Sequence, residues 1–211
     1  MIRYSWITGA VLAGGRARRM GGADKALLKV GTGATPQTRT ILSGILETFQ
    51  ERFAETIVVT SRGNAAGGVY GGYSVRVVAD QFENCGPLGG IHAALTAATT
   101  PMVFTCGCDM PHLSGPLIDF MAGNAVPAVP TAAGRLLVPV VDGRPEPLHA
   151  IYPRSCLADV DLALRDGVRM MVEFFQRVPV EWLPQDRFIH IEGAIKSFRN
   201  LNTPEDLEAE R

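Results

Sequence analysis

Leu12-Ala-Gly-Gly-Arg-Ala-Arg-Arg-Met-Gly-Gly-Ala-Asp-Lys25 continues an apolar run over residues 7–12 that stops at the glycine pair Gly14 and Gly15. Glycines at the end of a strand let the backbone approach a ligand closely and turn its N–H groups toward it. The arginines and the lysine that follow can offset the negative charge that those N–H groups bind. The stretch therefore predicts a phosphate-binding loop directly after the first strand, and a nucleotide-binding site formed by that loop.

The spacing of this loop differs from the two best-known phosphate-binding patterns. The G-x-x-x-x-G-K-[ST] loop needs a hydroxyl residue after the lysine, whereas Lys25 is followed by Ala26. The glycines also fail G-x-G-x-x-G, the dinucleotide-binding pattern. A plain surface turn with solvated charges stays open as the alternative for this segment taken alone.

Length and composition favour one α/β domain over residues 1–211. A chain of 211 residues, 46% of them hydrophobic, can bury about 70% of the surface that its unfolded state exposes. The net charge of -1 argues against nucleic acid and membrane surfaces as partners, because both call for a basic excess. Positive charge that matters for binding is therefore local, as over residues 16–25.

The cysteines and histidines lack the spacing of metal ligands. Buried free thiols are expected at Cys85, Cys106, Cys108 and Cys156, with a metal site or a disulfide as the alternative. No apolar run approaches the roughly 18 residues of a membrane-spanning helix. The first apolar stretch runs into glycines and arginines, unlike a cleavable signal. These features predict a protein of the reducing cytoplasm.

Strand and helix patterns alternate through the first half of the chain, which predicts βαβ units and a mostly parallel sheet with helices on both faces. The second half is less regular, and prolines there suggest edges or bends. The expected strands are residues 7–12, 56–60, 73–79, 102–106, 125–131, 136–141, 147–152, 178–183 and 188–191. The expected helices are residues 37–52, 86–98, 154–165 and 168–176, with a last one opening at Thr203.

Several polar features follow these strands, and ligands of open parallel sheets bind beyond the carboxyl ends of the strands. Thr60, Asp80 and Asp109 lie at such ends, and residues 86–90 open a helix whose free N–H groups could hold a base edge or a phosphate. Capping of a turn is the alternative for each aspartate, and tight helix packing is the alternative for residues 86–90. Asp109 suits Mg²⁺, which takes carboxylate oxygen, water and substrate phosphate as ligands.

With these residues in place, the chain resembles the molybdenum cofactor guanylyltransferases, a family of Rossmann-like nucleotidyltransferases. Residues 12–25 carry the main signature, and the other pieces occur in the family's order over nearly the whole chain. These pieces are Val78-Ala-Asp80, Gly86-Pro-Leu-Gly-Gly90, Cys108-Asp-Met-Pro111, Pro147-Leu-His-Ala-Ile-Tyr152 and Asn200-Leu-Asn-Thr-Pro-Glu-Asp-Leu207.

The resemblance implies a three-layer nucleotidyltransferase domain that transfers GMP from GTP to molybdopterin, or to its molybdenum-loaded form, and releases pyrophosphate. It implies Mg²⁺ as the cofactor, and transient contact with cofactor-insertion proteins or apo-molybdoenzymes. Attack by an ionised phosphate needs no general base, so catalysis reduces to positioning and charge neutralisation.

The same resemblance implies a role for individual residues of this sequence. Asp109 would hold the metal, and Arg19 and Lys25 would stabilise the departing pyrophosphate. Asn200 and Asn202 would lie on the acceptor side. The nucleotide-binding residues would be Leu12, Ala13, Gly14, Gly15, Lys25, Thr60, Asp80, Gly86, Pro87, Leu88 and Asp109.

Some features depart from the family, and other functions stay open. Relatives often place an asparagine after the second strand, where this chain has Thr60-Ser61, and Gly107 stands where a packed residue is expected. Residues 147–152 also read as a buried strand with His149 hydrogen-bonded in the core. A molybdopterin cytidylyltransferase or another small-molecule nucleotidyltransferase is the nearest alternative. A nucleotide-binding partner protein without transfer activity is a further one.

Overall fold

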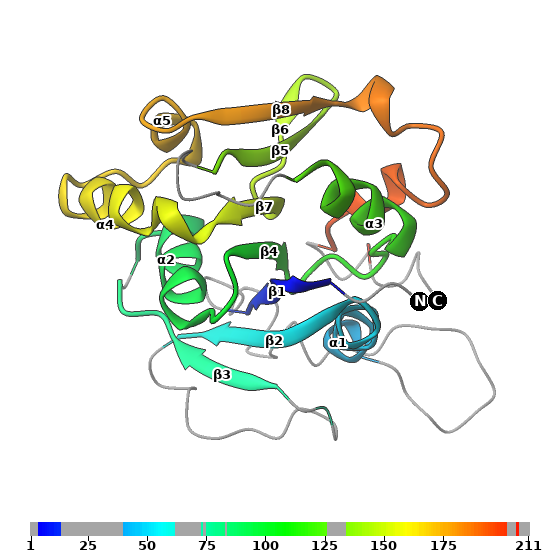
Figure 1. The fold of residues 1–211 in the computed structure, drawn as a ribbon, viewed down its shortest axis with the longest axis horizontal. Coiled ribbons are helices and arrows are strands. Elements are labelled where there is room, and N and C mark those ends of the chain that lie inside the picture. The colour runs from blue at the N-terminus through cyan, green and yellow to red at the C-terminus, as the bar shows by residue number, and fades with distance from the viewer. Residues whose placement is uncertain are drawn as a thin grey trace.

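The computed structural model describes residues 4–13, 40–61, 73, 75–82, 84–125, 134–201 and 206. In this part of the chain a single sheet is covered by helices on both faces (Figure 1). The strands are β1 (Tyr4–Leu12), β2 (Phe53–Thr60), β3 (Arg76–Ala79), β4 (Met102–Gly107), β5 (Leu136–Val141), β6 (Arg144–Pro145), β7 (His149–Pro153) and β8 (Val180–Pro184). The α-helices are α1 (Ile41–Arg52), α2 (Pro87–Ala97), α3 (Gly115–Asn124), α4 (Leu157–Arg165) and α5 (Met171–Phe175).

The sheet has a parallel half and a mixed half. Its order is β3-β2-β1-β4-β7-β5-β6, with β8 paired to β5. β1 runs parallel to β2 and β4, and β2 runs parallel to β3. β7 is antiparallel to β4 and β5, whereas β8 is parallel to β5. The expected α/β architecture with a parallel core is confirmed.

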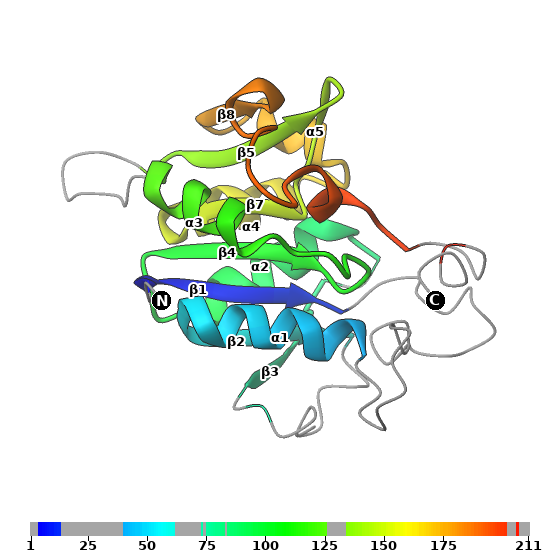
Figure 2. The ribbon, with the colours of Figure 1, turned by 90° about the vertical axis from the view of Figure 1, so that its right-hand side faces the viewer.

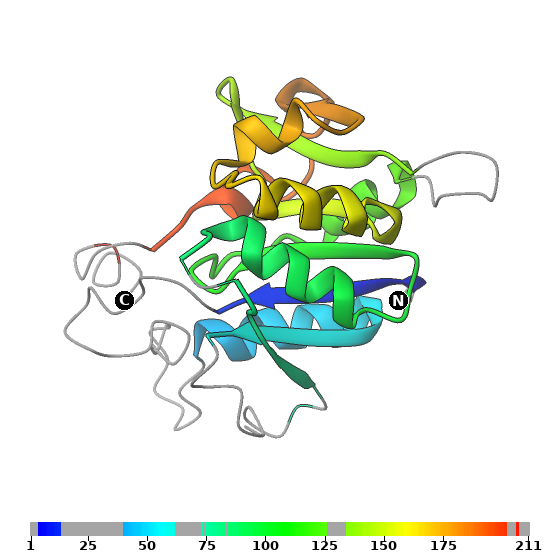
Figure 3. The ribbon, with the colours of Figure 1, turned by 90° about the vertical axis from the view of Figure 1, so that its left-hand side faces the viewer.

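The two faces of the sheet bury separate apolar clusters. α1 and α3 cover one face (Figure 2), and α2 and α4 cover the other (Figure 3). Side chains of β1 alternate between them, because successive residues of a strand point to opposite faces. Val11 packs in the cluster of α1 and α3, whereas Ala10 and Leu12 pack in the cluster of α2 and α4.

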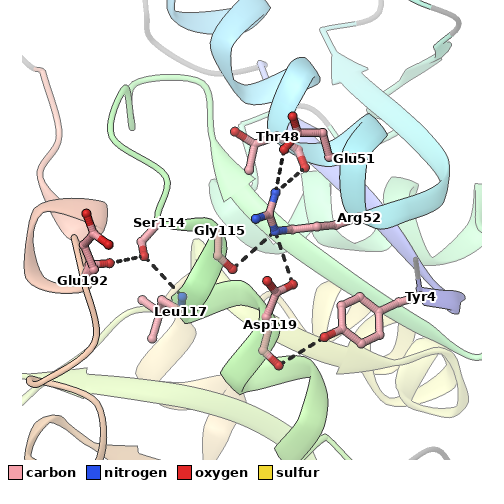
Figure 4. A network of polar contacts seen from close by, with 9 residues as sticks. All are labelled: Tyr4, Thr48, Glu51, Arg52, Ser114, Gly115, Leu117, Asp119 and Glu192. Atoms are coloured by element: carbon pink, nitrogen blue, oxygen red, sulfur yellow. Dashed lines mark hydrogen bonds and ion pairs between the residues drawn. The ribbon is translucent and has the colours of Figure 1, made fainter. Parts of the chain in front are cut away.

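Polar contacts tie α1 to α3 and to the start of β1 (Figure 4). Nε of Arg52, the last residue of α1, lies 3.2 Å from the Asp119 carboxylate and donates to the Gly115 carbonyl. Tyr4 Oη donates to the Asp119 carbonyl at 3.4 Å. Ser114 caps α3 by accepting from Leu117 N, and its hydroxyl donates to the Glu192 carbonyl at 2.6 Å.

Most predicted elements are confirmed, with shifted ends. The strand expected at 73–79 is shorter, β3, and the helix expected at 168–176 is the short α5. The helix expected at 154–165 is a 3₁₀ turn, η4 (Arg154–Cys156), followed by α4. Residues 37–39, 126–131 and the opening of the helix at Thr203 lie outside the described residues.

One sequence expectation is corrected, and one helix is missing from the sequence expectations. The strand expected at 188–191 is wrong, because the N–H groups of Phe188 and Ile189 both donate to the nearby Gln185 carbonyl, as in a turn. A 3₁₀ turn, η5 (Gln185–Arg187), precedes them. Helix α3 was not expected at all, although Ser114 and the following Gly-Pro are a recognisable start: a capping hydroxyl, then proline in the first turn.

Gly9 lets α1 and β2 approach the middle of β1 closely. A Cβ built on Gly9 would lie 2.5 Å from Phe49 Cδ2 and 2.6 Å from Phe53 Cδ2. The Phe49 and Phe53 rings are in turn 5.7 and 5.8 Å from the Phe104 ring, centroid to centroid. This aromatic cluster occupies the space that a side chain at position 9 would need.

We expect Gly9→Ala to lower the free energy of unfolding by about 1–3 kcal/mol, because overpacking forces side chains and backbone to shift. Urea denaturation monitored by circular dichroism measures the change. Gly123→Ala is the matched control, since a Cβ there meets nothing within 4 Å and alanine favours a helix. A Gly9→Ala protein as stable as the control would show that the cluster tolerates an extra methyl group.

Candidate active site

The carboxyl ends of the parallel strands meet at one edge of the sheet. The backbone hydrogen bonds between neighbouring strands continue past the strand ends. Ala13 N donates to Val59 O at 2.8 Å, and Asp80 N donates to Thr60 O at 2.8 Å. Cys108 N donates to Leu12 O at 3.3 Å, which places Asp109 beside the end of β1. The structure therefore brings the predicted residues that follow these four strands to one edge of the sheet, the rim.

Asp80 lies against the first turn of α2. Its Oδ1 accepts a hydrogen bond from Phe82 N at 2.8 Å, so this aspartate does cap a turn. A Cβ built on Gly89 would lie 2.9 Å from Asp80 Oδ2 and 3.0 Å from Phe82 O. Glycine at position 89 is thus the reason that the amino end of α2 can approach the carboxylate.

The start of α2 combines an unusual backbone conformation with close packing. Gly86, its N-cap, has φ of +62°, which L-residues rarely adopt. A Cβ on Gly90 would be 3.3 Å from Leu12 Cδ1, so Gly89 and Gly90 have the packing role that the sequence left open. The Leu88 side chain is fully buried in the core, so only its backbone could meet a nucleotide.

The loop between α4 and α5 adjoins this helix start, which the sequence did not indicate. A Cβ built on Gly86 would lie 3.5 Å from the Arg169 carbonyl oxygen. The Arg169 guanidinium donates to the carbonyls of Leu164 and Val168. Spatial proximity alone reveals this neighbour, because Arg169 lies far from Gly86 in the chain.

Thr60 is buried at the end of β2, with 3% of its surface exposed. Its hydroxyl donates to the Ser61 carbonyl at 3.2 Å. With its proton engaged, the hydroxyl can still accept a hydrogen bond from a ligand.

The absence of a side chain at Gly107 makes room for the Asp109 carboxylate. A Cβ at position 107 would lie 2.5 Å from Asp109 Oδ1, which explains the glycine where packing was expected. Leu201 N donates to the Asp109 carbonyl at 2.9 Å, so the returning C-terminal segment brings the exposed Asn200 to the same place. The structure thereby joins two predicted residues that are far apart in the chain.

The remaining predicted residues lie outside the described ranges. These are Gly14, Gly15, Arg19, Lys25 and Asn202. The phosphate-binding loop expected over residues 12–25 is therefore described only at its first two residues, Leu12 and Ala13.

No group of three or more His, Cys, Asp and Glu side chains suited to a metal occurs among the described residues. Asp109 nevertheless offers hard carboxylate oxygen, the donor that Mg²⁺ prefers, and Mg²⁺ commonly takes its other ligands from water and phosphate. The donor set at the rim therefore fits Mg²⁺ held together with a nucleotide.

Burial makes Cys106 and Cys156 unsuitable as nucleophiles. All four cysteines are buried thiols and none is part of a disulfide, as expected. Burial raises the pKa of Cys106 well above its ordinary value and raises that of Cys156 to about 12. Thiols that stay protonated at neutral pH are poor nucleophiles.

His149 lies opposite Cys106 across the β4–β7 pair and is fully buried. Its ring centroid is 5.1 Å from that of Phe104 and 4.6 Å from that of Phe198. The expected buried strand is confirmed, but the expected hydrogen bond of His149 is wrong, because neither ring nitrogen has a partner among the residues that the structure describes. Burial lowers the pKa of His149 from 6.5 to about 3.

The fold and the rim together are those of a nucleotidyltransferase. The chain superimposes with a TM-score of 0.76 on molybdopterin-guanine dinucleotide biosynthesis protein A from Archaeoglobus fulgidus, at 25% identity over 96% of both chains. It shares its fold, with a TM-score of 0.63 and 17% identity over 95% of both chains, with 2-C-methyl-D-erythritol 4-phosphate cytidylyltransferase from Thermus thermophilus.

The chain belongs to the family of the MobA-like NTP transferase domain, whose model matches residues 9–180. It is 34% identical over 203 residues to a protein of Pelotomaculum thermopropionicum named "probable molybdenum cofactor guanylyltransferase", covering 95% of this chain and 89% of that one. It is 28% identical over 202 residues to the molybdenum cofactor guanylyltransferase of Desulfosudis oleivorans, covering 96% and 93%. Among the described residues no helix is long and apolar enough to cross a membrane.

We expect His149 to make the protein less stable as the pH falls. The unfolded chain binds a proton at this side chain below its ordinary pKa of 6.5, whereas the folded protein does so only near its pKa of about 3. Between these values the free energy of unfolding falls by about 1.4 kcal/mol per pH unit from this group alone.

His149→Phe keeps an aromatic ring at this position and removes the contribution of the imidazole to the pH dependence of the free energy of unfolding. Urea denaturation between about pH 6.5 and about pH 4.5 should give a shallower loss of stability than in the wild-type protein. His190→Phe, which replaces an exposed imidazole with the same ring, is the matched control. Equal slopes for the wild-type protein and His149→Phe would contradict the burial of a neutral imidazole.

Proposed function

We propose that this protein is a molybdenum cofactor guanylyltransferase, which transfers GMP from GTP to molybdopterin or to its molybdenum-loaded form and releases pyrophosphate. The observation that carries the proposal is the single rim formed by Ala13, Asp80, the start of α2 and Asp109. The names of the similar proteins support the choice of guanine and of the molybdenum cofactor. The buried free thiols suit the reducing cytoplasm, where both substrates would be met.

The nucleotide would occupy the half of the rim formed by β1, β2 and β3. Leu12 and Ala13 would border the nucleotide, and the N–H groups of Gly14 and Gly15 would bind phosphate oxygens. Arg19 and Lys25 would offset the charge of the departing pyrophosphate. The backbone of Gly86, Pro87 and Leu88 would lie beside the guanine. Asp80 and Thr60 can each accept hydrogen bonds from the nucleotide.

Catalysis would consist of positioning and charge neutralisation. An oxygen of the acceptor phosphate forms a bond to the α-phosphorus of GTP, and the bond from that phosphorus to the bridging oxygen of pyrophosphate breaks. The attacking phosphate is ionised near neutral pH, so no protein base is required. When bound at Asp109, Mg²⁺ supplies positive charge to the phosphate oxygens. Asn200 and Asn202 would border the acceptor, and the product would pass to insertion proteins or apo-molybdoenzymes.

We expect Asp109→Asn to lower the rate of GMP transfer about 100-fold or more, because the carboxylate that holds the metal loses its charge at nearly constant shape. Transfer to molybdopterin at saturating Mg²⁺ measures the effect. Asp159→Asn, at an exposed position of α4, is the matched control. Full Mg²⁺-dependent transfer by Asp109→Asn would place the metal elsewhere.

Calorimetric titration with GTP, CTP and ATP, each with and without Mg²⁺, tests the choice of base. We expect GTP to bind most tightly, and Lys25→Ala to weaken its binding about tenfold or more by removing a charged phosphate contact. Arg135→Ala, at an exposed residue before β5, should bind GTP as the wild-type protein does. Preference for CTP would indicate a cytidylyltransferase, and no nucleotide binding would end the proposal.

A further inference from the structure

One buried histidine of α2 lies beside the nucleotide half of the rim and takes no part in the proposed reaction. His92 belongs to the second turn of α2, and only 8% of its surface is exposed. Its Nδ1 atom is buried and has no hydrogen-bond partner among the residues that the structure describes. A buried polar atom without a partner lowers stability. Leucine or phenylalanine would avoid that loss, so packing by itself does not account for the imidazole.

His92 and Gly89 lie on the same face of α2. Residues three apart are neighbours on a helix surface, and helical side chains lean toward the N-terminus of the helix. Asp80 approaches the helix at Gly89, since a Cβ there would lie 2.9 Å from Asp80 Oδ2. The His92 ring therefore extends from the second turn of α2 toward the residues that follow β3.

The His92 ring contacts the turn that holds the Asp80 carboxylate. Its centroid lies 4.8 Å from that of the Phe82 ring, and the two ring planes are 78° apart. Such an edge-to-face arrangement is favourable beyond the apolar area that it buries. The Phe82 N–H in turn donates to Asp80 Oδ1 at 2.8 Å. A chain of contacts thus runs from His92 through Phe82 to Asp80.

A second contact joins the imidazole to α4. His92 Nε2 lies 3.6 Å from Asp161 Oδ1, and Asp161 Oδ2 accepts a hydrogen bond from Arg165 Nε at 2.8 Å. α2 and α4 lie side by side on this face of the sheet (Figure 3). The imidazole therefore lies between the turn at the rim and a carboxylate of the neighbouring helix.

His92 is uncharged near neutral pH. Burial lowers its pKa below the ordinary value of 6.5, and this effect exceeds the opposing influence of Asp161 and Asp80, while Arg165 lowers the pKa slightly further. A neutral imidazole carries one proton, which lies on Nε2 because that nitrogen faces a carboxylate oxygen. The side chain therefore brings no positive charge that would compete with the nucleotide for Asp80.

We propose that His92 is a positioning residue of the nucleotide site, which holds Phe82 and, through it, the Asp80 carboxylate in the place where the nucleotide meets it. The inference rests on the proposed function, in which Asp80 accepts hydrogen bonds from the nucleotide. A phenyl ring at position 92 could contact Phe82 in the same way, but it would offer no N–H group to Asp161. A carboxylate that is already in place loses little conformational freedom when the ligand binds.

The test is calorimetric binding of GTP, with Mg²⁺, to His92→Ala. We expect the Kd for GTP to rise about tenfold or more, because the Asp80 carboxylate is no longer held where the nucleotide meets it. Steady-state transfer should show the same rise in KM for GTP with kcat within about twofold, because binding rather than chemistry is lost. Ile91→Val is the matched control: it removes a fully buried methylene from the same turn of α2 and should leave the Kd within about twofold.

A double-mutant cycle with Asp80→Asn distinguishes positioning from a general loss of packing. Asp80→Asn keeps the shape of the side chain and should by itself weaken GTP binding. If His92 acts through Asp80, His92→Ala should change the Kd by no more than about twofold once Asp80→Asn is present. A loss of packing unrelated to Asp80 would instead multiply the two effects. An unchanged effect of His92→Ala in the Asp80→Asn protein would overturn the proposal.

The outcomes also separate this inference from the proposed function. If the wild-type protein binds GTP and His92→Ala binds it equally tightly, the role of His92 is wrong and the proposed function stands. If the wild-type protein binds no nucleotide, the proposed function fails and the inference fails with it. His92→Gln, which keeps an N–H group but loses the ring contact with Phe82, replaces His92→Ala if that variant does not fold. A rise in its Kd of about threefold or more supports the role of His92, and wild-type affinity overturns it.

Discussion

β1 hydrogen-bonds in parallel to β2 on one side and to β4 on the other, and this pairing determines where each polar residue of the rim lies. Three strands that end in register bring Ala13, Thr60 and Cys108 to one edge. The bonds that continue past the strand ends then position Asp80 and Asp109. A one-residue slip of β1 would turn its alternating side chains to the wrong faces and unpack both clusters.

Glycine residues, which have no side chain, allow the close contacts that this strand pairing requires. At Gly9, the missing side chain lets Phe49 and Phe53 pack over the middle of β1. At Gly89, it lets α2 pack against Asp80, and at Gly107 it leaves space for the Asp109 carboxylate. In each case a Cβ would fall within 3.0 Å of an existing atom. The glycines of the core and those of the rim therefore serve the same purpose, which is to bring a strand or a carboxylate close to its neighbour.

The mixed half of the sheet gives the rim its second side. Because β7 reverses direction, β5 ends beside β4, and the C-terminal segment returns through a 3₁₀ turn, η6 (Ile195–Phe198), to bond with Asp109. Ser114 holds that segment to α3, so residues from the end of the chain are positioned by the middle of it. A site for two substrates needs such a second wall, which the parallel strands by themselves do not supply.

Sequence reasoning predicted the α/β class, the strands of the parallel half and the polar residues that follow them, because periodicity and strand ends are encoded in neighbouring residues. It missed α3, despite the Ser114 cap, and it predicted a strand at 188–191 where the backbone turns. Three-dimensional packing was needed to show that His149 has no hydrogen-bond partner in the described part of the chain, that Gly107 faces Asp109, and that η6 and the β5–β6 hairpin line one pocket. Each of these depends on contacts between residues far apart in the chain, and the pattern of neighbouring residues does not encode such distances.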